Sequence, residues 1–243
     1  MGRRQSGGDI VTTRGKSAGP RQKKIRVRGG KGRTASSRQW LERQLNDPYV
    51  ARAKREGMRS RAAYKLIEID DGARFLKRGA RVVDLGAAPG GWSQVAAERS
   101  GAPQHGRVIA IDILPMEPIP GVDFVKLDFV DPAAPKQIKR LLGGPATVML
   151  SDMAANATGH ARTDHLKIMA LVEAAADFAR EVLAPEGTFL AKVLQGGTEA
   201  ALLSSLKRDY KSVKHVKPQA SRSDSAELYL LATGFRGSAD TKA

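Results

Sequence analysis

Residues 82–93 constrain the fold of this chain more than any other segment. They read VVDLGAAPGGWS, so an apolar run ends in Asp84 and a turn rich in Gly and Ala leads into the start of a helix. Small residues let the backbone approach a ligand, and the free N–H groups at the start of a helix point toward it. The segment therefore indicates a strand–turn–helix unit that binds a cofactor containing a nucleoside.

Predicted strands and helices alternate along the rest of the chain. The predicted strands are 81–85, 107–112, 122–127, 147–151, 188–194, 212–217 and 228–232. The predicted helices are a short one within 40–50, then 60–69, 91–99, 133–142, 164–183 and 198–210. This alternation indicates an α/β fold with a mostly parallel sheet. The last two strands are joined by a loop too short for a crossover helix, so we expect a terminal antiparallel hairpin. A sheet of this kind favours a Rossmann-like class I methyltransferase fold over a dehydrogenase fold.

Charge is distributed unevenly along the 243 residues. Residues 1–39 contain 12 Lys and Arg and one acid, Asp9, whereas the other 204 contain 29 Lys and Arg and 24 Asp and Glu. The first segment is also rich in glycine and has few large apolar residues, so it cannot form a core. We expect a disordered basic tail over 1–39 that binds nucleic acid through phosphates, a folded domain over 40–236, and a short disordered tail over 237–243. A solubilising tail without a partner is the alternative.

Composition also restricts where the protein works. The chain contains no cysteine, which suits a reducing compartment and excludes thiolate metal sites. No apolar run is long enough for a membrane span, and the N-terminal segment lacks the apolar stretch expected of a secretion signal. We expect a cytoplasmic monomer that does not contact membranes. His160 and His165 lack the spacing of a helical ligand pair, so no metal site is expected.

Three strands are predicted to end in an acid at the edge where ligands bind. The dinucleotide pattern G-x-G-x-x-G is not met, because Ala88 occupies the position of its second glycine. Asp112 can accept hydrogen bonds from ribose hydroxyls, and Asp128 from an adenine amino group, with Phe129 beside the ring. Asp84 would lie near a positively charged part of the ligand. These acids favour S-adenosylmethionine over NAD, although a single Asp in such a position is more often a helix cap or turn residue.

Lys192 is the least ordinary residue of the chain. It lies in the run TFLAKVL, which is predicted to be a central strand, and lysine is almost never buried without a partner. A desolvated lysine loses proton affinity and can act as a base. Asp152 ends one strand and Glu227 begins an antiparallel one, so both can reach the edge where Lys192 lies. Lys65, on the helix before the first strand, can reach the same edge, or can simply be a solvated helix residue.

These motifs together resemble the FtsJ/RrmJ family of rRNA 2′-O-ribose methyltransferases (RlmE type), over about residues 38–236. The matching segments are 60–66, 84–94, 112–116, 151–154, 191–196 and 221–229. The resemblance implies S-adenosylmethionine as cofactor and a catalytic tetrad of Lys65, Asp152, Lys192 and Glu227. It also implies a set of cofactor-binding residues: Gly90, Trp92, Asp112, Asp128 and Asp152.

The expected reaction is methylation of the 2′-hydroxyl of a uridine in 23S rRNA of the large ribosomal subunit, late in ribosome assembly. Arg59, Arg61 and Lys65, together with Arg222, are expected to line an edge that faces RNA. Tyr229 either contacts the target nucleoside or packs in the core. Alternatives left open are 2′-O-methylation of tRNA or another RNA, a nicotinamide-dependent dehydrogenase, and an RNA-binding assembly factor without catalytic activity.

Overall fold

The computed structural model describes residues 26, 35–155, 159–195 and 200–237. The chain divides into two units, Met1–Asn46 and Asp47–Ala243. In the first unit the structure describes helix α1, Ala35–Leu45. This helix begins inside the segment for which a disordered tail is predicted, so the predicted boundary at residue 40 falls within a helix. Most of the predicted tail and the end of the C-terminal tail lie outside the described residues.

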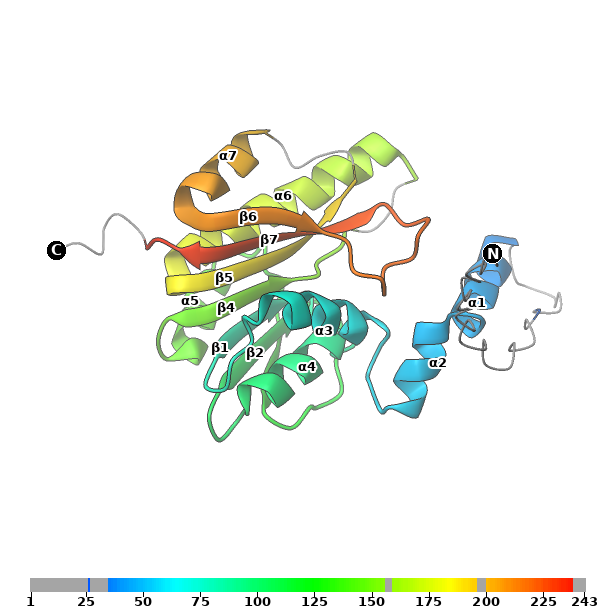
Figure 1. Ribbon diagram of the computed structural model, residues 1–243, viewed down its shortest axis with the longest axis horizontal. Coiled ribbons are helices and arrows are strands. Elements are labelled where there is room, and N and C mark those ends of the chain that lie inside the picture. Colours follow the sequence, from blue (N-terminus) through cyan, green and yellow to red (C-terminus); the bar gives the residue numbers. More distant parts are fainter. Residues whose placement is uncertain (1–25, 27–34, 156–158, 196–199, 238–243) are drawn as a thin grey trace, which may run out of the picture. The chain divides into compact units, whose positions relative to one another are not determined.

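The second unit contains the sheet and its helices (Figure 1). Its helices are α2 (Pro48–Arg55), α3 (Ala62–Ala73), α4 (Gly91–Ser100), α5 (Ala134–Leu142), α6 (Ala161–Val182) and α7 (Ala200–Asp209). Its strands are β1 (Arg81–Leu85), β2 (Arg107–Asp112), β3 (Val122–Lys126), β4 (Ala146–Ser151), β5 (Leu183–Leu194), β6 (Tyr210–Val216) and β7 (Glu227–Phe235). None of the helices in the described part of the chain combines the length and hydropathy that a membrane span needs.

The seven strands form one sheet in the order β3-β2-β1-β4-β5-β7-β6. Strands β1 to β5 pair in parallel, whereas β7 pairs antiparallel with both β5 and β6. This confirms the predicted α/β fold and its antiparallel end. The strand order reverses between β1 and β4, and ligands of open α/β sheets bind beside the carboxyl ends of strands at such a point.

Helices cover both faces of the sheet, α3 and α4 on one and α5, α6 and α7 on the other (Figure 1). Alternate residues of each strand enter the two cores, as the two-residue period of a strand requires. On β5, Phe189 packs toward α6 and α7, whereas Leu190 packs toward α3 and α4. Lys192 lies two residues after Leu190 and so shares its face. That places Lys192 on the side of the sheet that carries α3 and Lys65.

Strand bounds agree best where turn residues flank an apolar run. β1 and β2 have the predicted bounds, whereas β5 begins at Leu183 rather than at 188. Leu183 already pairs with Ala146, and a bulge separates that pair from the regular ladder that starts at Thr188. The extra residues include Pro185 and Gly187, which hide a strand start from a pattern search.

Candidate active site

The turn between β1 and α4 is built around glycines that no other residue can replace without movement. Gly86 has φ +75°, and a Cβ there would lie 2.8 Å from the backbone of Met153. Gly90 has φ +104°, and a Cβ there would meet Ile119 at 2.5 Å and Met116 at 2.9 Å. Positive φ and close packing both require glycine. The turn therefore packs against the residues that follow β4 and against the loop that follows β2.

Helix α4 begins directly after this turn, with Gly90 as its N-cap and no side-chain cap. The early N–H groups of a helix have no partner within it and can bind a ligand. Trp92 supplies one of these groups, but its indole is buried and its Nε1 donates to the Ala62 carbonyl at 2.9 Å. Trp92 can therefore contact a cofactor through its backbone rather than its side chain, because the indole is already bonded to α3.

Asp112 and Asp128 both lie where the sequence places them: Asp112 is the last residue of β2, and Asp128 follows β3 by two residues. One Asp112 oxygen accepts from the Ala88 N–H and the other from the Leu114 N–H, both at 2.8 Å. These bonds hold the carboxylate beside the glycine turn and leave each oxygen with a free lone pair. Asp128 is exposed and accepts from the Val130 N–H at 3.0 Å, so it also forms the turn contact typical of aspartate.

The expectation for Phe129 is wrong. Its ring is buried and packs edge-on against Phe178 of α6, with 5.6 Å between ring centroids. The side chain therefore belongs to the core between the sheet and α6. It does not face the space beside Asp128, since burying a phenyl ring against apolar neighbours is strongly favourable.

Asp84, at the end of β1, is fully buried. Its Oδ2 accepts from the Ser93 hydroxyl at 2.6 Å, whereas its Oδ1 has no hydrogen-bond partner. Burial raises the pKa of the Asp84 carboxyl to about 7, and the nearby charges of Asp152 and Asp112 act in the same direction. Three carboxylates thus share one region, and one oxygen is unsatisfied. A ligand with positive charge fits such a region. The sulfonium and ammonium groups of S-adenosylmethionine carry such charge.

The first lysine–carboxylate pair joins β5 to the end of β4. Lys192 is 7% exposed, and its Nζ lies 3.2 Å from Asp152 Oδ1 and donates to the Asp152 carbonyl at 2.8 Å. Asp152 is held in turn by its own N–H, which donates to the Leu85 carbonyl at 3.0 Å. Two contacts to one residue fix the ammonium in place. The lysine is therefore buried with a partner, as predicted.

The second pair joins α3 to the start of β7. Lys65 is also 7% exposed, and its Nζ donates to Glu227 Oε2 at 2.8 Å. The predicted convergence of Glu227 follows from register, because Leu194 pairs with Glu227 and Lys192 with Tyr229 in the antiparallel β5–β7 ladder. The alternative of a solvated Lys65 is wrong, since α3 turns this side chain into the protein.

The two pairs act on one another electrostatically. Burial alone would raise the pKa of Glu227, but the charge and hydrogen bond of Lys65, and then the charges of Lys192 and Arg61, hold it below its ordinary value. Glu227 is therefore an anion at neutral pH. Two lysines and two carboxylates from α3, β4, β5 and β7 thus occupy one end of the sheet.

Tyr229 is buried against two of the four residues, Asp152 and Lys65. It is fully buried and packs on Trp92, with 5.6 Å between ring centroids. Its hydroxyl donates to Asp152 Oδ1 at 3.4 Å, and Lys65 Nζ lies 5.6 Å from its ring centroid. Burial, with the charges of Asp152 and Glu227, raises the pKa of this phenol well above its ordinary value. Of its two predicted roles, the structure supports core packing.

Two of the arginines expected to face RNA are instead held by a buried acid. Asp47 Oδ2 lies 2.6 Å from Arg61 NH1 and 3.0 Å from Arg222 NH2. Asp47 also caps α2 by accepting from the Tyr49 N–H at 3.0 Å. The acid therefore ties α2, α3 and the β6–β7 loop together. Arg59 is exposed and donates to the Pro118 carbonyl.

Sequence reasoning missed this role of Asp47, although an Asp directly before a Pro is a recognised start signal for a helix. No group of His, Asp and Glu that could hold a metal occurs among the residues the structure describes. His160 and His165 do not form one.

Comparison with known proteins agrees with this geometry. Residues 58–235 match the model of the FtsJ-like methyltransferase family. The chain is 64% identical over 231 residues to ribosomal RNA large subunit methyltransferase E of Xanthobacter autotrophicus, covering 95% of this chain and 91% of the relative. It is 59% identical over 236 residues to the protein of that name from Parvibaculum lavamentivorans, covering 94% of this chain and 93% of the relative.

A solved structure is also similar over most of the chain. It is described as a ribosomal RNA methyltransferase from Plasmodium falciparum, with 31% identity and a TM-score of 0.66. The match covers 74% of this chain and 100% of the other. The matched region contains β1 to β7 and all residues of the two lysine–carboxylate pairs. This chain belongs to the FtsJ-like methyltransferase family.

Proposed function

We propose that this protein transfers a methyl group from S-adenosylmethionine to the 2′-hydroxyl of a ribose in large-subunit ribosomal RNA. The observation that carries the proposal is the meeting of Lys192–Asp152 and Lys65–Glu227 at the sheet edge that also holds the glycine turn. The relatives from Xanthobacter and Parvibaculum bear the name of a large-subunit ribosomal RNA methyltransferase, which supports this substrate.

The residues around the glycine turn fit the cofactor. The free N–H groups at the start of α4 suit its carboxylate, the Asp112 oxygens suit its ribose hydroxyls, and Asp128 suits its adenine amino group. Asp152 and the unsatisfied oxygen of Asp84 suit its positive end. When bound, S-adenosylmethionine supplies an electrophilic methyl group and leaves as a neutral thioether.

Lys192 acts as the general base in the proposed mechanism. In its neutral amine form, Lys192 Nζ would accept the proton of the ribose 2′-hydroxyl as that oxygen becomes the nucleophile for the methyl group. Asp152 orients Lys192 through both of its contacts. Lys65 supplies positive charge beside the developing alkoxide, and Glu227 holds Lys65 in position. Because the leaving group is neutral, alignment and deprotonation are the main requirements.

The direct test is methylation with labelled S-adenosylmethionine of large ribosomal subunits that lack the modification, protein-free rRNA and tRNA in parallel. We expect label on the large-subunit rRNA, at a ribose 2′-oxygen of a uridine when the nucleotide is mapped. Preference for assembled subunits over free rRNA would support action late in assembly. Label on tRNA alone, or on a base, would overturn the proposal.

Replacing Lys192 tests the assignment of the base. We expect Lys192→Ala to lower turnover by about 10²–10⁴-fold, because a positioned base contributes about that much. Cofactor affinity, measured by calorimetry, should stay within a few-fold of the wild type. Lys136→Ala, at an exposed lysine of α5, is the matched control and should leave turnover unchanged. Near-normal turnover of Lys192→Ala would show that another group removes the proton.

A further inference from the structure

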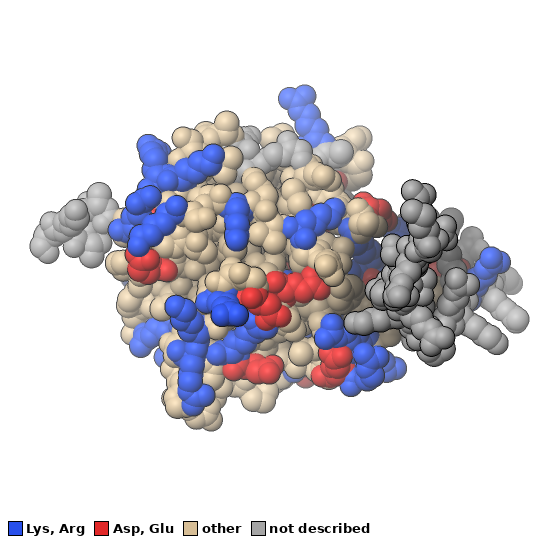
Figure 2. All heavy atoms as spheres, viewed as in Figure 1, with Lys and Arg blue, Asp and Glu red and all other residues tan. Residues whose placement is uncertain are grey.

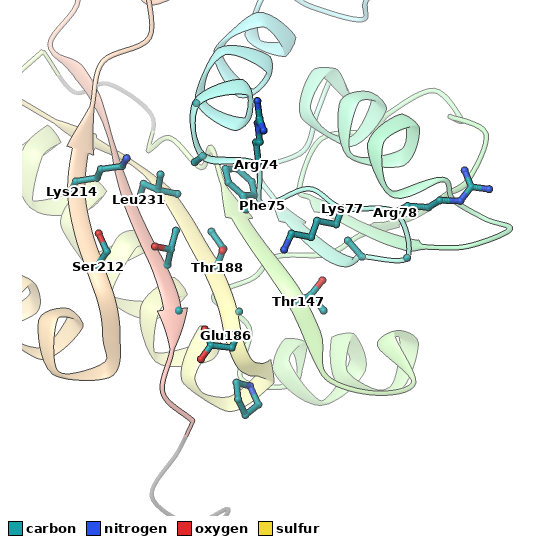
Figure 3. Close-up of a pocket in the computed structure, with 18 residues that line it drawn as sticks. Arg74, Phe75, Lys77, Arg78, Thr147, Glu186, Thr188, Ser212, Lys214 and Leu231 are labelled. Carbon is teal, nitrogen blue, oxygen red and sulfur yellow. The ribbon is translucent and has the colours of Figure 1, made fainter.

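A basic groove lies at the other end of the sheet from the tetrad. A groove of about 640 Å³ opens where α3 leads into β1, beside the amino-terminal ends of β4 and β5 and the end of β7 (Figure 3). One wall is the segment from Gly72 to Ala80, and the other is β6. The proposed reaction uses none of these residues.

A row of hydroxyls forms the floor of this groove. Thr233 of β7 pairs in register with Thr188 of β5 on one side and with Ser212 of β6 on the other. Residues paired in this way point to the same face of the sheet, about 4.8 Å from strand to strand. In the described part of the chain, none of these three hydroxyls has a hydrogen-bond partner. They are free to donate to a ligand.

Basic side chains border the hydroxyl row on both sides. In Figure 3, Lys77 reaches from the α3–β1 wall toward the hydroxyls and Lys214 lies on the β6 side. Arg74 extends along α3, and Arg78 extends away from the hydroxyls and contacts His105. Within the described residues, Arg74, Lys77 and Lys214 form no ion pair. The one acid of the lining, Glu186, is neutralised by Lys211 at 2.5 Å.

The groove is therefore cationic. Lys and Arg side chains are also spread over the β6 and β7 side of the face in Figure 2.

This chemistry suits backbone phosphates more than bases. Lysine, arginine and hydroxyl donors contact phosphate oxygens in nucleic-acid complexes and fix the register of the protein on the chain. Bases of single strands commonly stack on exposed aromatic rings, and the one aromatic residue of this lining, Phe75, is only 8% exposed. An acidic protein segment is the rival ligand, since its carboxylates can also accept from hydroxyls. The comparison of assembled subunits with free rRNA described below separates the two.

The groove lies close enough to the reaction edge for one RNA to reach both. Thr188 and Lys192 are four residues apart on β5, which corresponds to about 13 Å along the strand. Helix α3 carries Lys65 at its first turns and borders the groove at its last residues. We propose that the groove is a second RNA-binding surface, which holds phosphates of the substrate RNA away from the target ribose. This inference rests on the proposed function.

Charge reversal of the free groove residues tests the proposal. The variant combines Arg74→Glu, Lys77→Glu and Lys214→Glu, and its matched control combines Lys136→Glu, Lys207→Glu and Arg208→Glu on α5 and α7, across the sheet. KM and kcat are measured with large subunits that lack the modification, and affinity for protein-free rRNA is measured across a salt series. A neutral variant with Gln at the three groove positions repeats this with less disturbance of the fold.

We expect the groove variant to raise KM by at least about 10-fold near physiological salt, with kcat at saturation and cofactor affinity unchanged. Its slope of log affinity against log salt should fall by about 2–3, one for each lost phosphate contact. The control should change KM by less than about 3-fold.

Equal losses in both variants, or none in the groove variant, would overturn the proposal. Loss on assembled subunits but not on free rRNA would point to a protein partner and would also overturn it. If wild-type protein methylates no rRNA, the proposed function fails. The rRNA affinities of the groove variant and its control still test whether the groove binds RNA.

Discussion

The charged form of the Asp84 side chain opposes folding near neutral pH. Its carboxyl is fully buried, and only one of its oxygens has a hydrogen-bond partner. Hydrogen bonding to Ser93 favours the charged form, but desolvation outweighs it. A residue that costs stability and serves no packing need suggests a role with a ligand. Its place beside the glycine turn is consistent with stabilising a positively charged cofactor.

The buried state of Asp84 predicts a pH-dependent stability difference. Its pKa rises from 3.8 to about 7 on folding. Because the folded protein holds this proton more tightly than the unfolded chain, protonation of Asp84 contributes to the free energy of unfolding. That contribution is fully present below about pH 4 and is lost as the pH rises through about 7. The shift corresponds to at most about 4 kcal/mol. We expect Asp84→Asn, which stays neutral and can still accept from Ser93, to match the wild type near pH 4 and exceed it at pH 8.

Urea denaturation of both proteins without cofactor, at several pH values between 4 and 8, measures this difference. Groups that do not interact with Asp84 titrate equally in the two proteins and cancel in the comparison, whereas Asp152 and Asp112, whose charges act on Asp84, contribute to the measured difference. Parallel stability curves for wild type and variant would mean that Asp84 is already charged in the folded protein.

At the residue scale, the sequence predicts which side chains meet at the site better than it predicts how they pair with one another. Lys192 is predictable because a lysine in an apolar strand needs a partner, and strand direction alone brings Glu227 to the same edge. That Lys192 pairs with Asp152 while Lys65 pairs with Glu227 depends on where α3 lies on the sheet. The role of Asp47 depends on Arg61 and Arg222, which are far apart in the chain. Contacts of this range leave no local pattern.

At the scale of elements, the β1–α4 turn is limited by its contact with the end of β4. Gly86→Ala would place a Cβ 2.8 Å from the Met153 backbone at φ +75°. We expect it to lower the free energy of unfolding by roughly 2 kcal/mol or more, because left-handed backbone and overpacking both cost energy. Cofactor affinity should fall as well, since Met153 directly follows Asp152. Chemical denaturation and calorimetry measure the two effects.

Gly72→Ala is the matched control for this turn. Gly72 lies in α3 with open space around it and no positive φ, so alanine there should be neutral or stabilise by up to about 1 kcal/mol. If both variants had the same stability, the close packing of the turn would not matter.

Element boundaries are predictable where local signals are strong. β1 and β2 are apolar runs flanked by turn residues, and their bounds need no other information. The early start of β5 and the burial of Phe129 both depend on neighbours, Ala146 for the strand and Phe178 for the ring. The groove is of the same kind, because its hydroxyl row exists only once β5, β7 and β6 are aligned.

At the scale of the whole molecule, positive charge is available to RNA in two ways. One is the groove, whose basic residues come from separate elements of the folded unit. The other is the segment before α1, where 1–34 contain eleven Lys and Arg and one acid. Electrostatic binding of RNA is independent of sequence and weakens with salt. Charge in the segment before α1 should therefore raise affinity for RNA without altering the chemical step.

Deleting residues 1–34 tests that division of roles. We expect the deletion to raise KM for large subunits and to make KM depend less steeply on salt than in the wild type, because fewer phosphate contacts remain. At low salt and saturating substrate, kcat should stay within about 2-fold of the wild type, because the tetrad is untouched. The control keeps the length of the segment but replaces its Lys and Arg with Gln, and should behave like the deletion. Methylation kinetics at several salt concentrations measure both. A fall in kcat at low salt would mean that this segment takes part in catalysis itself, since loss of phosphate attraction acts on binding.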